Sequence, residues 1–335
     1  MSLNITLNIS LDDWGKFVEK HPAGNVFQTP EMAEVFERTK LHKPLLFTTV
    51  NSKGEILSLI LAVQVKALNW LPSRSVSRCI VYGGILAGED QRPEEVSNLL
   101  TYLNSAVQSS TLVTEIRNVT DTSTFRRDVI CCGFDYYDYL NYLIPLDRNP
   151  DEIFQRFSRT RRQNIRKLEI DGVHIQEACE RADVSRIYDI LRQTYARVKV
   201  PLADISLFQA TFDVMHPLGM TKFYLAKMGP REIAVAVALL FKRTIYLWYL
   251  GTRKEFLRTN AASLLVWHLA KWGSLNGYEI LDFLGAGRPE EPYGVREFKK
   301  RFGGNEVNYG RYQKIHAPLL LKFGEKAYEF YRKLL

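Results

Sequence analysis

The chain has 335 residues, of which 46% are hydrophobic and 24% are charged, a composition typical of a folded globular protein and not of a disordered one. Its length predicts two domains of ordinary size, and its net charge of +8 favours anionic partners such as phosphates, nucleic acid or a membrane surface. No apolar run approaches the roughly 20 residues that span a bilayer, and the first residues do not predict a signal peptide, so we expect a cytoplasmic protein without a transmembrane segment.

Hydrophobic periodicity and turn residues predict the same order of elements in both halves of the chain. In the first half we expect helices at 11–19, 30–39 and 93–108, a short helix after 117, and strands at 45–50, 56–65, 76–82, 112–117 and 136–144. In the second half we expect helices at 151–170, 181–198, 204–215, 258–275 and 294–301, and strands at 173–176, 221–228, 232–241, 244–250, 280–284 and 306–315. The pattern predicts an α/β protein with two domains of one topology, 1–147 and 148–335, each a mixed, mostly antiparallel sheet flanked by helices.

The expected helix at 151–170 starts the second domain, because Asn149 is a suitable N-cap and Pro150 a suitable first helical residue. At 3.6 residues per turn, Arg159, Arg162 and Arg166 fall on one narrow arc, opposite an apolar arc. Three guanidinium groups on one stripe can bind a diphosphate or a nucleic-acid backbone. The alternative is a solvated outer face with no ligand.

The segment Gly277-Tyr-Glu-Ile-Leu-Asp-Phe-Leu-Gly-Ala-Gly287 predicts a short strand that carries Asp282 and ends in a glycine-rich turn. It is followed by Tyr293-Gly-Val-Arg-Glu-Phe-Lys-Lys-Arg-Phe-Gly-Gly304, a brief cationic helix with a Gly-Gly stop. A strand of this kind, with a loop and a basic helix beyond it, commonly forms a ligand crevice in α/β proteins.

These two segments resemble the signature of the Fem-type aminoacyltransferases, which build peptidoglycan interpeptide bridges and belong to the GNAT acyltransferase superfamily. The resemblance extends to Ser158-Arg-Thr-Arg-Arg-Gln-Asn-Ile-Arg-Lys167 and, near the start, to Gly24-Asn-Val-Phe-Gln-Thr-Pro-Glu-Met32, in which Gln28 matches the family's glutamine. It implies two tandem GNAT-like domains, with the acyl-transfer cleft in the second. The chain departs from the family at Met32, where Trp is usual, and at Phe36, where some members carry a phosphate-binding lysine.

Acyl transfer to an amine needs a stabilised oxyanion and a group that accepts a proton. We predict that Lys299 supplies positive charge, and that Asp282 either acts as the base or orients Arg288 or Lys299. The alternatives are a surface lysine and a helix-capping aspartate. The remaining predicted substrate-binding residues lie in both domains: Gln28, Arg159, Arg162, Arg166, Tyr249, Tyr293 and Arg301.

The acyl donor is predicted to be a co-substrate, aminoacyl-tRNA or acyl-CoA, and not a permanently bound cofactor. The segment from Arg258 to Ser263 is a degenerate copy of the glycine-rich run with which GNAT enzymes hold the coenzyme A pyrophosphate, since Ala261 stands where glycine is needed. This favours aminoacyl-tRNA. The four cysteines have no CxxC spacing and the histidines no HxxxH spacing, so no metal is expected.

We therefore predict an enzyme that transfers an aminoacyl or other acyl group onto an amine of a cell-wall or cell-envelope precursor. Two alternatives stay open: an acyl-CoA-dependent N-acetyltransferase acting on a sugar or small amine, and a non-catalytic protein of the same fold that binds tRNA or another anionic ligand. An amphipathic tail at 319–334 is expected to pack within the fold, to pair subunits or to contact the membrane peripherally.

Overall fold

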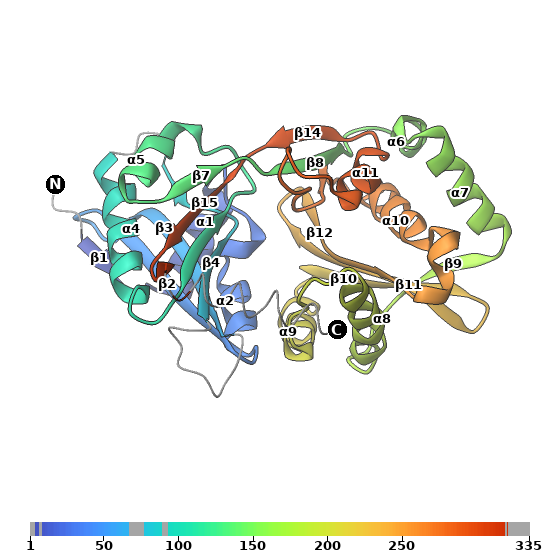
Figure 1. The fold of residues 1–335 in the computed structure, drawn as a ribbon, viewed down its shortest axis with the longest axis horizontal. Coiled ribbons are helices and arrows are strands. Elements are labelled where there is room, and N and C mark those ends of the chain that lie inside the picture. Colours follow the sequence, from blue (N-terminus) through green and yellow to red (C-terminus); the bar gives the residue numbers. More distant parts are fainter. Residues whose placement is uncertain (1–3, 7–8, 67–76, 89–92, 319, 321–335) are drawn as a thin grey trace. The chain divides into compact units, whose positions relative to one another are not determined.

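The structure is a computed structural model that describes residues 4–6, 9–66, 77–88, 93–318 and 320, so most of the expected tail at 319–334 lies outside the described residues. It contains two compact units (Figure 1). Unit 1 comprises the described residues up to Asp138 and from Tyr309 onwards, and unit 2 comprises Tyr139–Asn308.

This division differs from the one expected at 147/148, because two of the expected long strands are each split between the units. The expected strand at 136–144 is β7 (Asp135–Tyr137) in unit 1 and β8 (Leu140–Pro145) in unit 2. The expected strand at 306–315 is β14 (Asn305–Asn308) in unit 2 and β15 (Arg311–Ile315) in unit 1. Gly310, with φ of +62°, breaks the second strand in a conformation that favours glycine.

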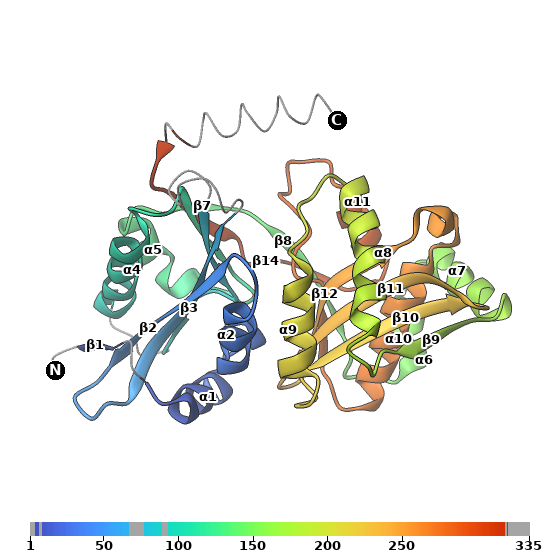
Figure 2. The ribbon, with the colours of Figure 1, turned by 90° about the horizontal axis from the view of Figure 1, so that it is seen from below.

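In unit 1 the sheet has the strand order β1-β2-β3-β4-β6-β15-β7, and β5 pairs with β3. The other strands of this sheet are β1 (Asn4–Thr6), β2 (His42–Val50), β3 (Ile56–Lys66), β4 (Ser77–Tyr82), β5 (Leu86–Ala87) and β6 (Val113–Arg117). The helices are α1 (Leu11–Lys20), η1 (Val26–Gln28), α2 (Pro30–Glu37), α4 (Pro93–Val107), η2 (Ser123–Phe125) and α5 (Arg126–Cys131). Helices α4 and α5 cover one face of the sheet, and α1 and α2 cover the other (Figures 1 and 2).

In unit 2 the sheet has the strand order β14-β8-β13-β12-β11-β10-β9. Its remaining strands are β9 (Val173–Glu177), β10 (Thr221–Met228), β11 (Arg231–Phe241), β12 (Thr244–Thr252) and β13 (Ile280–Asp282). The helices are α6 (Pro150–Arg156), α7 (Arg159–Ile170), α8 (Asp183–Arg197), α9 (Ile205–Met215), η3 (Lys254–Thr259), α10 (Ala261–Leu275) and α11 (Gly294–Lys300). Helices α8 and α9 pack on one face, while α10, with α6 and α7, packs on the other (Figure 2).

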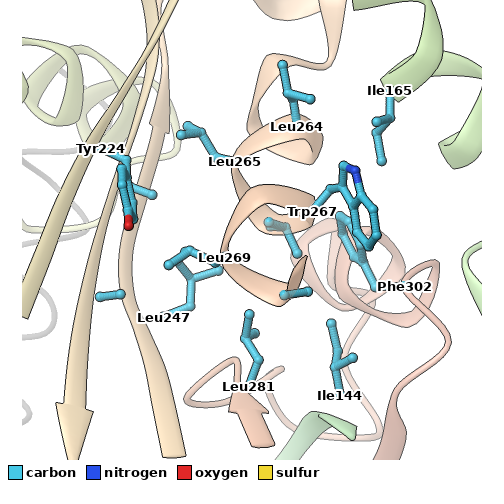
Figure 3. Close-up of a cluster of buried hydrophobic side chains, with 14 of the residues drawn as sticks. Ile144, Ile165, Tyr224, Leu247, Leu264, Leu265, Trp267, Leu269, Leu281 and Phe302 are labelled. Atoms are coloured by element: carbon cyan, nitrogen blue, oxygen red, sulfur yellow. The ribbon is translucent and has the colours of Figure 1, made fainter. Parts of the chain in front are cut away.

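The core of unit 2 is centred on α10, which is buried along most of its length. Figure 3 shows Leu264, Leu265, Trp267 and Leu269 of α10 between the strand residue Tyr224 on one side and Phe302 on the other. Trp267 contacts the rings of Phe154, in the last turn of α6, and of Phe157, the residue directly after α6. These contacts explain why the expected single helix at 151–170 is broken: Phe157 turns into the core, and Ser158 caps a new helix by accepting a hydrogen bond from the Arg161 N–H.

The predicted fold class is confirmed. Both sheets are mixed, and among the described strands each sheet has one parallel pair, β4 with β6 in unit 1 and β12 with β13 in unit 2. Within the part of the chain that the structure describes, no helix is both long enough and apolar enough to cross a bilayer. The same residues contain no cluster of His, Cys, Asp or Glu suited to a metal ion.

Candidate active site in unit 2

The candidate site begins where β13 stops pairing with β12. The two strands are parallel through only three residue pairs, and the last pair joins Tyr246 to Asp282. Beyond it β12 continues to Thr252, whereas the chain after Asp282 stays hydrogen-bonded to β8 on the other side, from the N–H groups of Phe283 and Ala286. The end of β13 is therefore a point at which two neighbouring strands separate.

Asp282 is buried at this point, with 2% of its surface exposed, and its carboxylate organises the turn that follows. Its Oδ1 atom accepts hydrogen bonds from Asn141 Nδ2 at 2.7 Å and from the Leu284 N–H at 2.6 Å. Asn141, on β8, in turn accepts the Gly285 N–H through Oδ1 at 2.8 Å. Leu284 has a φ of +57°, a strained conformation for a residue with a side chain, and these bonds hold it there.

Lys299 reaches the same turn from α11. Its Nζ donates to the carbonyl oxygens of Phe283 at 2.7 Å and Gly285 at 2.5 Å, and it lies 5.6 Å from the centre of the Phe283 ring. Burial raises the pKa of Asp282 to about 6, while the bonds from Asn141 and Leu284 and the positive charge of Lys299 oppose this rise. The structure thus brings together the two residues that the sequence predicted to be catalytic.

Arg296 holds the loop beyond this turn and was not singled out from the sequence. Its guanidinium donates to the carbonyl oxygens of Ala286 at 3.0 Å, Pro289 at 2.9 Å and Glu291 at 3.0 Å, and also to that of Arg288. Two cations of one short helix therefore bind most of the carbonyl groups of a glycine-rich loop. The sequence signal was available, because Arg296 lies one helical turn before Lys299 in the same motif.

The Gly-Gly stop after α11 allows a close approach between main chains. A Cβ atom on Gly303 would lie 2.2 Å from the Arg156 carbonyl oxygen, and one on Gly304 would lie 2.7 Å from that of Leu143. The preceding Phe302 is fully buried in the core of unit 2. This packing fixes the C-terminal end of α11 against α6 and β8.

The buried arginine of α7 is Arg161, which is not one of the three arginines of the predicted stripe, Arg159, Arg162 and Arg166. Arg162 donates to the carbonyl oxygens of Gln155 and Phe157 at the end of α6, and Arg166 lies 5.5 Å from the Phe154 ring centre. Arg159 is exposed, but Arg161 is only 4% exposed and donates to the Ser263 hydroxyl. The sequence analysis missed Arg161, although its spacing from the buried residues of α7 places it on the apolar face.

Three further predicted residues lie around α11 and β12. Tyr249 packs against Phe208 with ring centres 4.7 Å apart and against Tyr195 with ring centres 5.7 Å apart. Tyr293 is 40% exposed and its ring covers Gly287, where a Cβ atom would come within 2.8 Å of it. Burial, with a smaller contribution from Tyr293, raises the pKa of Tyr195 to about 12, so these two phenols lie within electrostatic reach of each other. Arg301 is exposed, and its carbonyl oxygen accepts the Ser158 N–H.

The role predicted for Gln28 is corrected by the structure. This residue of unit 1 is fully buried, and its side-chain amide donates to the carbonyl oxygens of Tyr82, at the end of β4, and Gly84, in the turn that follows, and accepts the N–H of Leu61 within β3. A side chain held in this way joins η1 to the sheet and has no surface on which to bind a substrate.

Two surface hollows lie away from Asp282 and Lys299. One is in unit 1 between α1 and α2 and is lined by Trp14, Pro30 and mostly charged residues. The other lies in unit 2 beside Arg231 and Phe256. The site is thus located by its chemistry and by the separation of β12 from β13, not by these hollows.

The chain is similar to known proteins in sequence and in fold. Residues 155–300 match the acetyltransferase (GNAT) domain family. The lipid II:glycine glycyltransferase of Staphylococcus aureus is 21% identical over 243 residues, which make up 68% of this chain and 56% of that protein. The chain thus spans little more than half the length of this curated relative.

The fold is shared with solved structures over nearly the whole chain. FemX has a TM-score of 0.72 at 16% identity, covering 96% of this chain and 99% of the FemX chain. A tandem GNAT protein from the clavulanic acid biosynthesis pathway has a TM-score of 0.57 at 8% identity, covering 94% and 99% of the two chains. Residues 155–300 thus match the GNAT domain family, and the chain is similar in sequence to a lipid II:glycine glycyltransferase and in fold to FemX.

Proposed function

We propose that the chain is an aminoacyltransferase that moves an aminoacyl group from a charged tRNA onto an amine of a cell-wall precursor such as lipid II. The observation that carries this proposal is the Lys299 ammonium, held beside the buried Asp282 at the point where β13 leaves β12. This point lies inside the segment that matches the acetyltransferase domain. The staphylococcal relative is a lipid II:glycine glycyltransferase, which supports the choice of the transferred group and of the acceptor class.

In the proposed reaction the neutral acceptor amine attacks the ester carbonyl carbon of the aminoacyl-tRNA. A C–N bond forms, the ester C–O bond breaks, and the proton lost by the amine passes to the departing ribose oxygen, so atoms and charges balance. The carbonyl oxygen carries negative charge in the tetrahedral intermediate. A fixed positive charge in a partly buried site lowers the free energy of such an intermediate, because the charge needs no rearrangement during the reaction.

We assign this electrostatic role to Lys299. Its two bonds to main-chain carbonyl groups hold the ammonium in one place, which is what preorganised stabilisation requires. Asp282 is 2% exposed and uses Oδ1 to fix Leu284, so its proposed role is to anchor the turn that binds Lys299. The sequence suggested two roles for Asp282, as a base or as a residue that orients Lys299. We propose the second role.

Other predicted residues are proposed as substrate contacts. Arg159 and Arg166 on α7 and Arg301 directly after α11 are exposed cations, suited to the phosphates of a tRNA or of a precursor. Tyr249 and Tyr293 are proposed to line the acceptor side. These assignments can be tested singly, because a lost phosphate contact should raise the KM and leave the kcat nearly unchanged.

Two features at the start of α10 favour tRNA over coenzyme A as the donor. Ala261, the first residue of the helix, is fully buried. The Ser263 hydroxyl in the first turn is already bonded by Arg161. A pyrophosphate approaching this helix start would meet the β-carbon of Ala261 and a hydroxyl group that is already bonded to Arg161.

The proposal is tested by incubating the full chain with lipid II and radiolabelled glycyl-tRNA, and in parallel with radiolabelled acetyl-CoA. Transfer of label to lipid II from the tRNA, lost in Lys299→Met, is the expected result. Transfer from acetyl-CoA to an amine would instead establish the N-acetyltransferase. Binding of tRNA without transfer to any of a panel of amine acceptors would identify the non-catalytic alternative.

A further inference from the structure

Arg161 is a buried cation that joins three helices of unit 2. It lies on the face of α7 that also carries the buried residues Ile165 and Leu168. Its Nη1 donates to the Ser263 hydroxyl on α10, and its guanidinium carbon lies 4.6 Å from the ring centre of Phe298 and 4.9 Å from that of Phe302. Phe298 belongs to α11, and Phe302 follows its end.

The electrostatic surroundings of Arg161 do not favour a charge. Burial, and then the nearby positive charge of Arg301, lower the pKa of Arg161 to about 10, and its buried Nε atom has no hydrogen-bond partner. Among the described residues no carboxylate lies within ion-pair distance of its guanidinium. A buried ion without a counter-ion contributes little to stability, and an apolar residue of similar size is often as stable in its place. Stability alone therefore does not account for an arginine here.

The contacts of Arg161 lead directly to Lys299. Helix α11 has seven residues, none of which is buried, and its N-cap residue makes no side-chain cap. Its position consequently depends on a few side chains, and Phe298, stacked under the Arg161 guanidinium, immediately precedes Lys299. A shift of this ring would move the next residue away from the carbonyl oxygens of Phe283 and Gly285.

We propose that Arg161 is a positioning residue for the acyl-transfer reaction, which acts by holding Phe298 so that Lys299 stays on the turn after Asp282. This inference rests on the proposed function, in which Lys299 stabilises the oxyanion. Arg161 does not touch the reacting atoms. Its planar guanidinium suits this task, because it stacks on two rings and donates to Ser263 at the same time.

The kinetic test compares Arg161→Met, Phe298→Leu and the double variant with the wild type, using lipid II and glycyl-tRNA. Each single variant is expected to lower kcat on the order of tenfold to hundredfold while KM changes by less than about threefold, because misplacing a catalytic group affects the transition state and not ground-state binding. The double variant should be no slower than the slower single variant, since both substitutions remove the same contact between Arg161 and Phe298. Lys167→Met, which removes an exposed charge from the same helix, is the matched control and should behave as the wild type. A kcat for Arg161→Met within about threefold of the wild type, or additive losses in the double variant, would overturn the proposal.

A second measurement needs no turnover and separates this inference from the proposed function. The pKa of the Asp282 carboxyl, followed by carbon NMR, should rise in both Arg161→Met and Phe298→Leu, because the charge of Lys299 moves away from it. Phe298→Leu removes no charge, so a rise in that variant reports a displaced Lys299. Unchanged titration in both variants refutes the positioning role even if the wild type transfers glycine. A rise in both, with an inactive wild type, leaves the positioning role standing and refutes the proposed function.

Discussion

The substitution Asp282→Asn tests the electrostatics of the site most directly. Asp282 Oδ1 accepts both of the hydrogen bonds described for its carboxylate, from Asn141 and from Leu284, and an asparagine can keep both through its own Oδ1. The change therefore removes the charge and keeps the shape. It separates the free-energy cost of the buried charge from the anchoring of the turn.

The size of the effect follows from the pKa of Asp282, which burial raises from 3.8 to about 6. Between these pH values the folded protein keeps a proton that the unfolded chain has already lost, so the free energy of unfolding falls as the pH rises through this window. A difference of about two pH units corresponds to about 3 kcal/mol. Relative to the wild type, Asp282→Asn should therefore gain about 3 kcal/mol between about pH 4 and about pH 7.

Urea unfolding of both proteins at several pH values measures this difference, with Asp171→Asn, at an exposed helix end, as the control. Free energies of unfolding that run parallel for the wild type and Asp282→Asn over this range would refute the reasoning. The activity of Asp282→Asn distinguishes an anchoring role of Asp282 from a role as proton acceptor. With the turn intact, kcat near pH 8 should fall by less than about tenfold, whereas a loss of about 10²- to 10⁴-fold would make Asp282 the proton acceptor instead.

Three further substitutions test other parts of the structure. Lys299→Met should lower kcat on the order of 10²- to 10³-fold in the transfer assay, and an unaffected rate would exclude the oxyanion role. Gly303→Ala should lower the free energy of unfolding by more than about 2 kcal/mol, because its φ is +64° and the new Cβ would meet the Arg156 carbonyl group. Gly172→Ala is its control, since φ is +75° but nothing lies within 4 Å, and about 1 kcal/mol is expected; equal losses would show that crowding does not matter. In unit 1, the charges of Arg117 and Arg311 outweigh burial and lower the pKa of Glu115 to about 2, so its contribution to stability should be lost as the pH falls from 4.5 towards 2. Glu115→Gln should abolish that part of the pH dependence in urea unfolding, and an unchanged acid profile would contradict it.

The fold class and the closeness of Asp282 and Lys299 could be predicted from the sequence, because both depend on local patterns. Alternating apolar residues and turn signals define strands such as β10 and β11, whose observed bounds lie within one residue of the expected ones. Asp282 and Lys299 lie only 17 positions apart in one motif, so a strand, a turn and a short helix are enough to bring them together.

Only the tertiary structure determines which sheet is joined by each of the strands β7, β8, β14 and β15, at the junctions between the units, and which polar residues surround the site. A strand pattern specifies the faces of a strand but not its partners, so nothing local shows that β8 joins unit 2 or that β15 returns to unit 1. For the same reason Asn141 could not be found, since its contact with Asp282 spans 141 positions of the chain. Gln28 was singled out from the sequence because it matches a motif. Only the packing of η1 against the sheet shows that its side-chain amide bonds main-chain groups, because burial is a property of the whole fold.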